Sequence, residues 1–133
     1  MHRTWLLIVT AIAEVGTGLV LLVFPPILLA LLLGIEQASP ETVLVSRVAG
    51  AALLALGVAC WLARNDRGGP AHLGLLVGVL VYDIAAAAIL AYAGLFVNLH
   101  GIALWPAVVL HVALAVWCVV CLSSPTGTHF PRS

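Results

Sequence analysis

The stretch TWLLIVTAIAEVGTGLVLLVF, from Thr4 to Phe24, contains a single charged residue, Glu14, and is followed directly by Pro25-Pro26. An α-helix rises about 1.5 Å per residue, so about 20 apolar residues are needed to cross roughly 30 Å of hydrocarbon. The stretch has that length, and the prolines end it because proline cannot continue the helical hydrogen bonds. It therefore predicts a membrane-spanning helix, which is too long and too polar at Glu14 for a cleaved signal peptide.

The composition of the whole chain agrees with a membrane protein. Of its 133 residues, 64 % are hydrophobic and only 8 % are charged, whereas a soluble domain has about 25 % charged residues. Five arginines balance five acidic residues and lysine is absent, so no basic surface is available for nucleic acid. The composition excludes a disordered chain, a disulfide-rich secreted domain and a cytosolic enzyme.

Three further stretches have the length of a span. They cover about residues 40–63, 71–93 and 105–122, and the first of these begins with the capping sequence Ser39-Pro40-Glu41. Between the first two spans, residues 26–34 are apolar but too few to cross, which favours an interfacial or re-entrant segment docked against the bundle. We expect a single all-α domain over residues 1–133, a four-helix membrane bundle with spans at about 4–24, 40–63, 71–93 and 105–122.

The arginines predict the orientation of these spans. Arg3, Arg64, Arg67 and Arg132 fall on one side of a four-span arrangement, and the loops on the other side contain no basic residue. We expect the chain to lie in the inner (plasma) membrane, and the positive-inside rule then places both termini in the cytoplasm.

One ionisable side chain lies inside each span: Glu14, Arg47, Asp83 and His111. At about 1.5 Å per residue, Glu14 and Asp83 lie about 15 and 18 Å from the cytoplasmic ends of their helices. By the same rise, Arg47 and His111 lie about 8 to 11 Å from the opposite ends. In a hydrocarbon layer about 30 Å thick, all four are within about one helical turn in depth.

Such groups are costly when buried singly, so we expect them to face inward and pair. The predicted pairing is Arg47 with Glu14 or Asp83, with His111 donating or accepting a hydrogen bond. Thr17 shares a helix face with Glu14, and Tyr82 is adjacent to Asp83 in sequence. The candidate ligand-binding or proton-binding residues are therefore Glu14, Thr17, Arg47, Tyr82, Asp83 and His111. Alternatively, the same network only fixes the register of the helices.

Two other patterns are better explained by packing. Cys118 and Cys121 form a CxxC sequence at the cytoplasmic end of the fourth span, with Cys60 at a similar depth, and small apolar packing residues are the preferred interpretation in a reducing compartment. Ala107, one turn before His111, leaves room for a flat macrocycle, but a tetrapyrrole is not favoured because no second histidine lies at the same depth. A metal site from Glu14, Asp83 and His111 is chemically conceivable, but their spacing in sequence gives no support and no metal is predicted.

The chain resembles the DoxX-like group of small bacterial four-helix membrane proteins. The shared features are the proline-terminated first span, the apolar segment ending in Leu33-Gly34, the sequence Arg47-x-x-Gly50, a polar residue within span three and a histidine in span four. The resemblance implies an architecture, and some members of the group look like accessory subunits of quinone-linked oxidoreductases.

Three functions fit these features. The first is a non-catalytic protein, either an accessory subunit of other membrane proteins or a binder of a quinone, isoprenoid or lipid at the polar layer. The second is a proton-coupled small transporter, which requires an oligomer such as a homodimer. The third is a membrane-embedded acid–base enzyme acting on a lipophilic substrate, with Glu14 and Asp83 as proton carriers.

Overall fold

A computed structural model describes residues 2–66 and 69–123, and every secondary-structure element within them is helical. The helices α1, α3, α4 and α5 are long and apolar enough to cross a membrane, and α2 is a short helix between α1 and α3. The predicted all-α fold is confirmed, and the chain is a small multi-pass membrane protein. The helices are α1 (His2–Val23), α2 (Pro25–Leu33), α3 (Pro40–Ala63), α4 (Pro70–Phe96) and α5 (Leu104–Ser123).

The ends of the helices follow from local sequence. Prolines occupy the first turns of α2, α3 and α4, where no intrahelical N–H is lost. The backbone N–H of Thr42 donates to the Ser39 hydroxyl and caps α3. Gly34 ends α2 in the left-handed conformation, with φ of 71°. The spans therefore begin and end within three residues of the predicted limits.

α1 and α3 form one closely packed pair. A Cβ atom at Gly18 would lie 2.7 Å from the carbonyl oxygen of Gly50, and one at Gly50 would lie 2.8 Å from that of Gly18. A Cβ atom at Gly57 would lie 3.1 Å from the carbonyl oxygen of Ala11 and 3.0 Å from the backbone nitrogen of Val15. Small residues at these positions let the two backbones touch, as they do in many membrane helix pairs.

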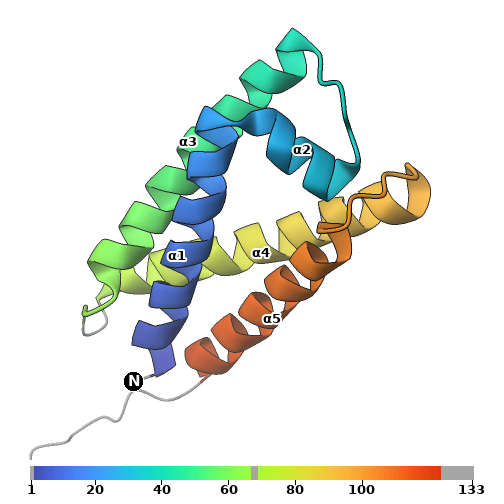
Figure 1. The fold of residues 1–133 in the computed structure, drawn as a ribbon. Coiled ribbons are helices and arrows are strands. Elements are labelled where there is room, and N and C mark those ends of the chain that lie inside the picture. The colour runs from blue at the N-terminus through green and yellow to red at the C-terminus, as the bar shows by residue number, and fades with distance from the viewer. Residues whose placement is uncertain (1, 67–68, 124–133) are drawn as a thin grey trace, which may run out of the picture.

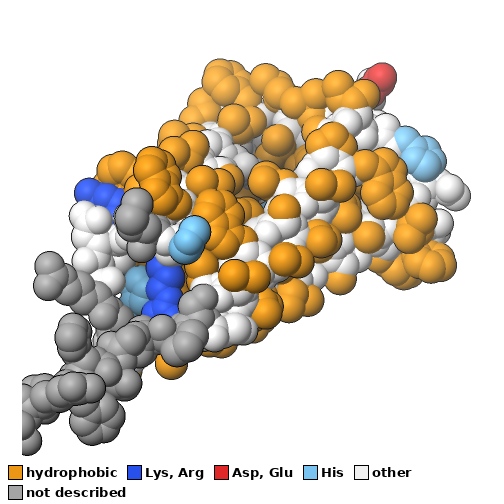
Figure 2. All heavy atoms as spheres, turned by 90° about the horizontal axis from the view of Figure 1, so that it is seen from below, with side chains coloured by type: hydrophobic (Ala, Val, Ile, Leu, Met, Phe, Trp, Pro, Cys, Tyr) orange, Lys and Arg blue, Asp and Glu red, His pale blue; other side chains and the backbone are white. Residues whose placement is uncertain are grey.

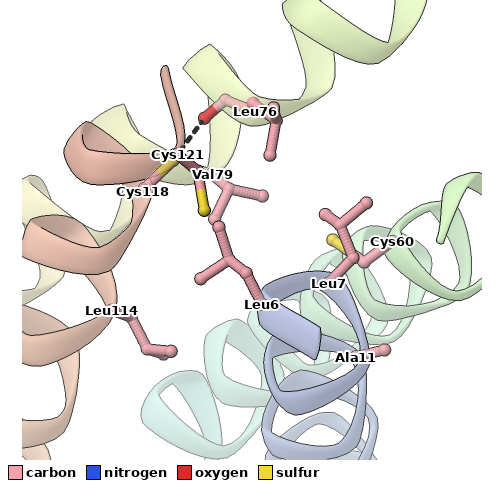
Figure 3. Packing of buried hydrophobic residues seen from close by; sticks show 9 residues of the cluster. All are labelled: Leu6, Leu7, Ala11, Cys60, Leu76, Val79, Leu114, Cys118 and Cys121. Carbon is pink, nitrogen blue, oxygen red and sulfur yellow. Dashed lines mark hydrogen bonds between the residues drawn. The ribbon is translucent and has the colours of Figure 1, made fainter. Parts of the chain in front are cut away.

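α4 and α5 form the second pair, and the two pairs diverge from a common end (Figure 1). At that end an apolar cluster joins the start of α1, the end of α3, the start of α4 and the end of α5 (Figure 3). At the opposite end the short helix α2 lies between the pairs and contacts α1, α3 and α5. The cluster consists of Leu6, Leu7, Ala11, Cys60, Leu76, Val79, Leu114, Cys118 and Cys121.

α2 is held in place by the chain that enters α5. The backbone N–H of Ala103 donates to the carbonyl oxygen of Leu31 over 2.9 Å. Gly101 lies against the backbone of Leu31 and Leu32, where a Cβ atom would be only 2.2 Å from the Leu31 oxygen. The segment predicted at residues 26–34 is therefore helical and docked against the bundle.

The outer surface is that of a protein surrounded by lipid. Figure 2 shows hydrophobic side chains covering the length of the helices, with charged and histidine side chains gathered toward the two ends. Near one end, the Arg3 guanidinium donates two hydrogen bonds to the carbonyl oxygen of Cys121, at 3.1 and 2.8 Å. Arg67 and Arg132, which also entered the predicted orientation, lie outside the described residues.

Candidate functional site

The divergence of the two helix pairs leaves a cavity of about 470 Å³ between them. Its volume falls in the range of about 300 to 1,000 Å³ that is common for small-molecule sites. Most of its wall is alanine, leucine and isoleucine, and the polar side chains on it come from four residues of α1, α4 and α5. Those four are Glu14, Thr17, Tyr82 and His111.

Asp83 and His111 form the central contact of this polar group. Nδ1 of His111 lies 2.8 Å from Oδ1 of Asp83, which is completely buried between α4 and α5. The His111 side chain is 13 % exposed and lines the cavity, whereas Asp83 lies behind it. Asp83 therefore orients the imidazole, and the other ring nitrogen of His111 stays available to a molecule in the cavity.

Glu14 approaches the same point from α1. Its side chain is 2 % exposed, and one ligand atom from each of Glu14, Asp83 and His111 lies within 4.8 Å of the other two. The ring of Tyr82 meets that of His111 edge to face, with centroids 5.5 Å apart, and Tyr82 lines the same cavity as Glu14. The structure thus brings together three of the four ionisable residues that share a depth.

Arg47 is the exception. It is exposed, it does not line the cavity, and within residues 2–66 and 69–123 no ion pair joins it to Glu14 or Asp83. The predicted pairing is therefore wrong. The reason is helical phase: at about 100° per residue, Arg47 lies about 200° around α3 from Ala49, which faces the cavity. Arg47 lies at the predicted depth, but on the face of α3 opposite to the one that lines the cavity.

Thr17 and Tyr82 both lie on the cavity wall, as expected for binding residues. Tyr82 is about 100° from Asp83 on α4, and this offset lets Asp83 face α5 while Tyr82 faces the cavity. The contribution of α2 was not predicted. Leu28 and Leu32, one turn apart on the face of α2 that meets the bundle, close the cavity on one side. The proline pair and the short apolar run indicated a docked segment but not its place on the cavity wall.

Small side chains on α4 and α5 provide the space. Ala85, Ala86 and Ala107 line the cavity, and their small side chains leave room beside His111. Close approach of two helices occurs instead at Gly50. Because Ala85 and Ile89 line the cavity and are also exposed on the outer surface, the cavity opens toward the lipid.

The three cysteines lie away from the cavity. All are free thiols and are buried in the apolar cluster at the closed end of the bundle. The Cys118 thiol donates to the carbonyl oxygen of Leu76 over 3.2 Å (Figure 3). Their surroundings agree with the interpretation of the CxxC sequence as packing residues.

The fold and the site together define a small helical, multi-pass membrane protein with an interior cavity that opens to lipid. The polar residues on its wall, Glu14, Thr17, Tyr82 and His111, are called its polar floor below. Comparisons with protein-family models, with curated proteins and with solved structures find no match to the chain. The resemblance to the DoxX-like group is not tested by these comparisons and stays a prediction.

Proposed function

We propose that this chain binds an apolar molecule with a polar head, of the quinone, isoprenoid or lipid class, in the cavity between its two helix pairs. The observation that carries the proposal is the cavity itself, because its wall is apolar over most of its area and its polar side chains are gathered at one place. A long apolar body with one polar end has the matching distribution of chemistry.

The polar floor offers both kinds of hydrogen-bonding group. Tyr82 has a phenolic hydroxyl that can donate to a carbonyl oxygen, and His111 has a ring nitrogen not used by Asp83. Glu14 and Thr17 add acceptors from α1. A quinone carbonyl, a prenol hydroxyl or a lipid head would each find a partner there, which is why the proposal names a class rather than one compound.

The opening toward lipid supports entry from the bilayer. Exposed lining residues occur on α3 at Ala49 and on α4 at Ala85 and Ile89. A second hollow of about 230 Å³ adjoins the cavity between α2 and α3 and shares Leu28 and Leu32 with it. A molecule dissolved in the membrane could pass between these helices without crossing water.

The cellular setting belongs to the same proposal. The positive-inside rule favours an inner (plasma) membrane with both termini in the cytoplasm. The resemblance to the DoxX-like group adds a role as an accessory subunit, with the apolar molecule presented to other membrane proteins or to a second copy of the chain. A proton-coupled transporter gains no observation of its own and stays an alternative.

A membrane-embedded acid–base enzyme is the second candidate, favoured by the Asp83–His111 contact and the nearby Glu14. An oriented imidazole beside a carboxyl group is a common arrangement for proton transfer. The identity of the recovered molecule separates the two. Binding alone returns it unchanged, whereas an enzyme converts it, and conversion must stop in Glu14→Gln and Asp83→Asn proteins that remain helical.

Photocrosslinking in bilayers tests the binding site. Diazirine-bearing prenol, quinone and fatty-acid probes are each irradiated with the protein in nanodiscs, and the labelled positions are mapped by mass spectrometry. For the class that binds, label should concentrate on residues 28–32 and 85–90 and fall when the unlabelled parent molecule is added in excess.

The exposed faces of the same helices provide the control. Val81 and Ile84 on α4 are exposed and do not line the cavity, so their labelling reflects lipid contact and should not be competed away. If every probe labels these positions and the cavity wall alike, with no effect of competitor, the proposed function is wrong.

A further inference from the structure

The cluster of Glu14, Asp83 and His111 has the composition and spacing of a metal site. It combines two carboxylates and one imidazole from three different helices, and their ligand atoms lie within 4.8 Å of one another. A divalent transition metal with ligands at about 2.0 to 2.2 Å keeps neighbouring ligand atoms about 3 Å apart and opposite ones about 4.4 Å apart. The hydrogen bond between His111 Nδ1 and Asp83 Oδ1, at 2.8 Å, holds these two side chains together, and an ion bound to both atoms would take the place of its proton.

Two buried side-chain oxygens on α1 and α4 lack hydrogen-bond partners among the described residues. One is Oδ2 of Asp83, whose side chain has no exposed surface, and the other is Oγ1 of Thr10, one turn before Glu14 on α1. An unpartnered carboxylate oxygen in an apolar interior is costly. A cation between the three helices would give Asp83 the partner that the protein does not supply.

The charge balance also favours a divalent cation. Glu14 and Asp83 together carry two negative charges when ionised, and in the described part of the chain no arginine forms an ion pair with either. Arg47, the expected counter-charge, faces away from them. One divalent ion would make the set neutral, as the surrounding hydrocarbon requires.

We propose that Glu14, Asp83 and His111 bind one divalent first-row transition-metal ion at the floor of the cavity. The imidazole nitrogen selects this class over Mg²⁺ and Ca²⁺, which prefer oxygen ligands alone. Three protein ligands leave at least one coordination position open. Because Glu14 and His111 both line the cavity, that position faces the space where a lipophilic molecule would place its polar head.

Metal binding is measured with Co²⁺ alone as the probe. Protein without a polyhistidine tag is stripped with chelator, freed of the chelator and titrated with Co²⁺ in detergent while its visible absorption bands are recorded. We expect one ion per chain in the wild type. Asp83→Asn, Glu14→Gln and His111→Gln should each weaken binding at least about tenfold, since even outer-shell groups of metal sites change affinity about 10- to 100-fold.

Exposed residues of the same types are the matched controls. Glu36→Gln and His100→Gln change a carboxylate and an imidazole in the loops and should leave Co²⁺ binding unchanged. The proposal is overturned if the wild type binds no Co²⁺, or if folded Asp83→Asn and His111→Gln proteins bind it as tightly as the wild type. Helical content by circular dichroism shows whether each variant is folded.

A measurement on the wild type alone covers the case in which the variants do not fold. X-ray absorption of the Co²⁺-loaded protein should show imidazole and carboxylate ligands, and an ion surrounded only by water would contradict the proposal. One further variant shows whether the metal proposal or the proposal of a bound lipophilic molecule has failed. Ala86→Leu reduces the cavity without touching a proposed ligand, so it should lose the lipophile and retain Co²⁺.

Discussion

Nδ1 of His111 lies 2.8 Å from Oδ1 of Asp83, and this contact joins α5 to α4 beside the polar residues of the cavity. The two residues are 28 positions apart in sequence. The contact fixes the rotation of α4 against α5, and with it the face of α4 that presents Tyr82 and the small alanines to the cavity.

Replacing one member of this pair should destabilise the protein more than replacing both. His111→Leu leaves the fully buried Asp83 without its partner, whereas the double variant His111→Leu/Asp83→Leu removes both polar groups. Hydrogen bonds between membrane helices contribute about 0.6 kcal/mol on average and up to about 1.7 kcal/mol, so we expect a coupling free energy of about 1 kcal/mol or more. A double-mutant cycle by reversible unfolding in mixed micelles measures it, and additive single effects would show that the contact contributes nothing.

Arg47→Leu should leave retention of the bound molecule unchanged. Arg47 lies about 200° around α3 from the cavity-lining Ala49, and no polar contact joins it to Glu14 or Asp83. His111→Leu removes a hydrogen-bonding group from the floor and should weaken retention about fivefold, because such a bond contributes about 1 kcal/mol. Quantifying the co-purified molecule in both variants decides this. Loss of the molecule in Arg47→Leu would mean that α3 turns its other face to the site.

Gly50→Val should separate α1 from α3. A Cβ atom added at Gly50 would lie 2.8 Å from the Gly18 carbonyl oxygen and 3.0 Å from the Leu22 nitrogen, and neither backbone can yield without moving a helix. Overpacking of this kind costs about 1 to 3 kcal/mol, which thermal unfolding in detergent would register as a lower midpoint. Gly74→Ala is the control, since no atom lies within 4 Å of its added Cβ. Equal midpoints for the two variants would contradict the close packing.

The cysteines should resist alkylation in the folded protein. Cys60, Cys118 and Cys121 are free and lie in the apolar cluster, each 2 % exposed or less. A membrane-permeant maleimide should therefore label none of them until the bundle is unfolded in SDS, and mass spectrometry counts the additions. Rapid labelling of Cys118 and Cys121 together would point to an accessible dithiol and reopen a redox role for the CxxC sequence.

The sequence predicted the fold and the depth of the site residues more fully than the rotation of each helix about its own axis. Apolar length and the prolines were enough to place the four long helices and α2, because membrane spans are set by hydrocarbon thickness. Depth also follows from the chain alone, and it brought Glu14, Asp83 and His111 to one level. The face of α3 that turns inward depends on the contact of Gly18 with Gly50, which involves two helices, and this is why Arg47 was placed in the cluster.

The cavity itself could not be read from the sequence. Alanines at positions 85, 86 and 107 are compatible with close packing or with open space, and the structure has open space because the helix pairs diverge. Where the pairs are apart, α2 lies between them, held by the Ala103–Leu31 hydrogen bond. Small residues beside a polar cluster indicate a cavity only once the angle between the pairs is known.

Native mass spectrometry of the protein extracted gently from its own membranes tests the central claim most directly. The wild type should carry one apolar molecule, which Ala86→Leu should lose because the added side chain fills the cavity wall. Ala88→Leu, on the exposed side of α4, should keep it. A bare wild-type chain, or a bound molecule equally retained by Ala86→Leu, would contradict the assignment of the cavity as a binding site.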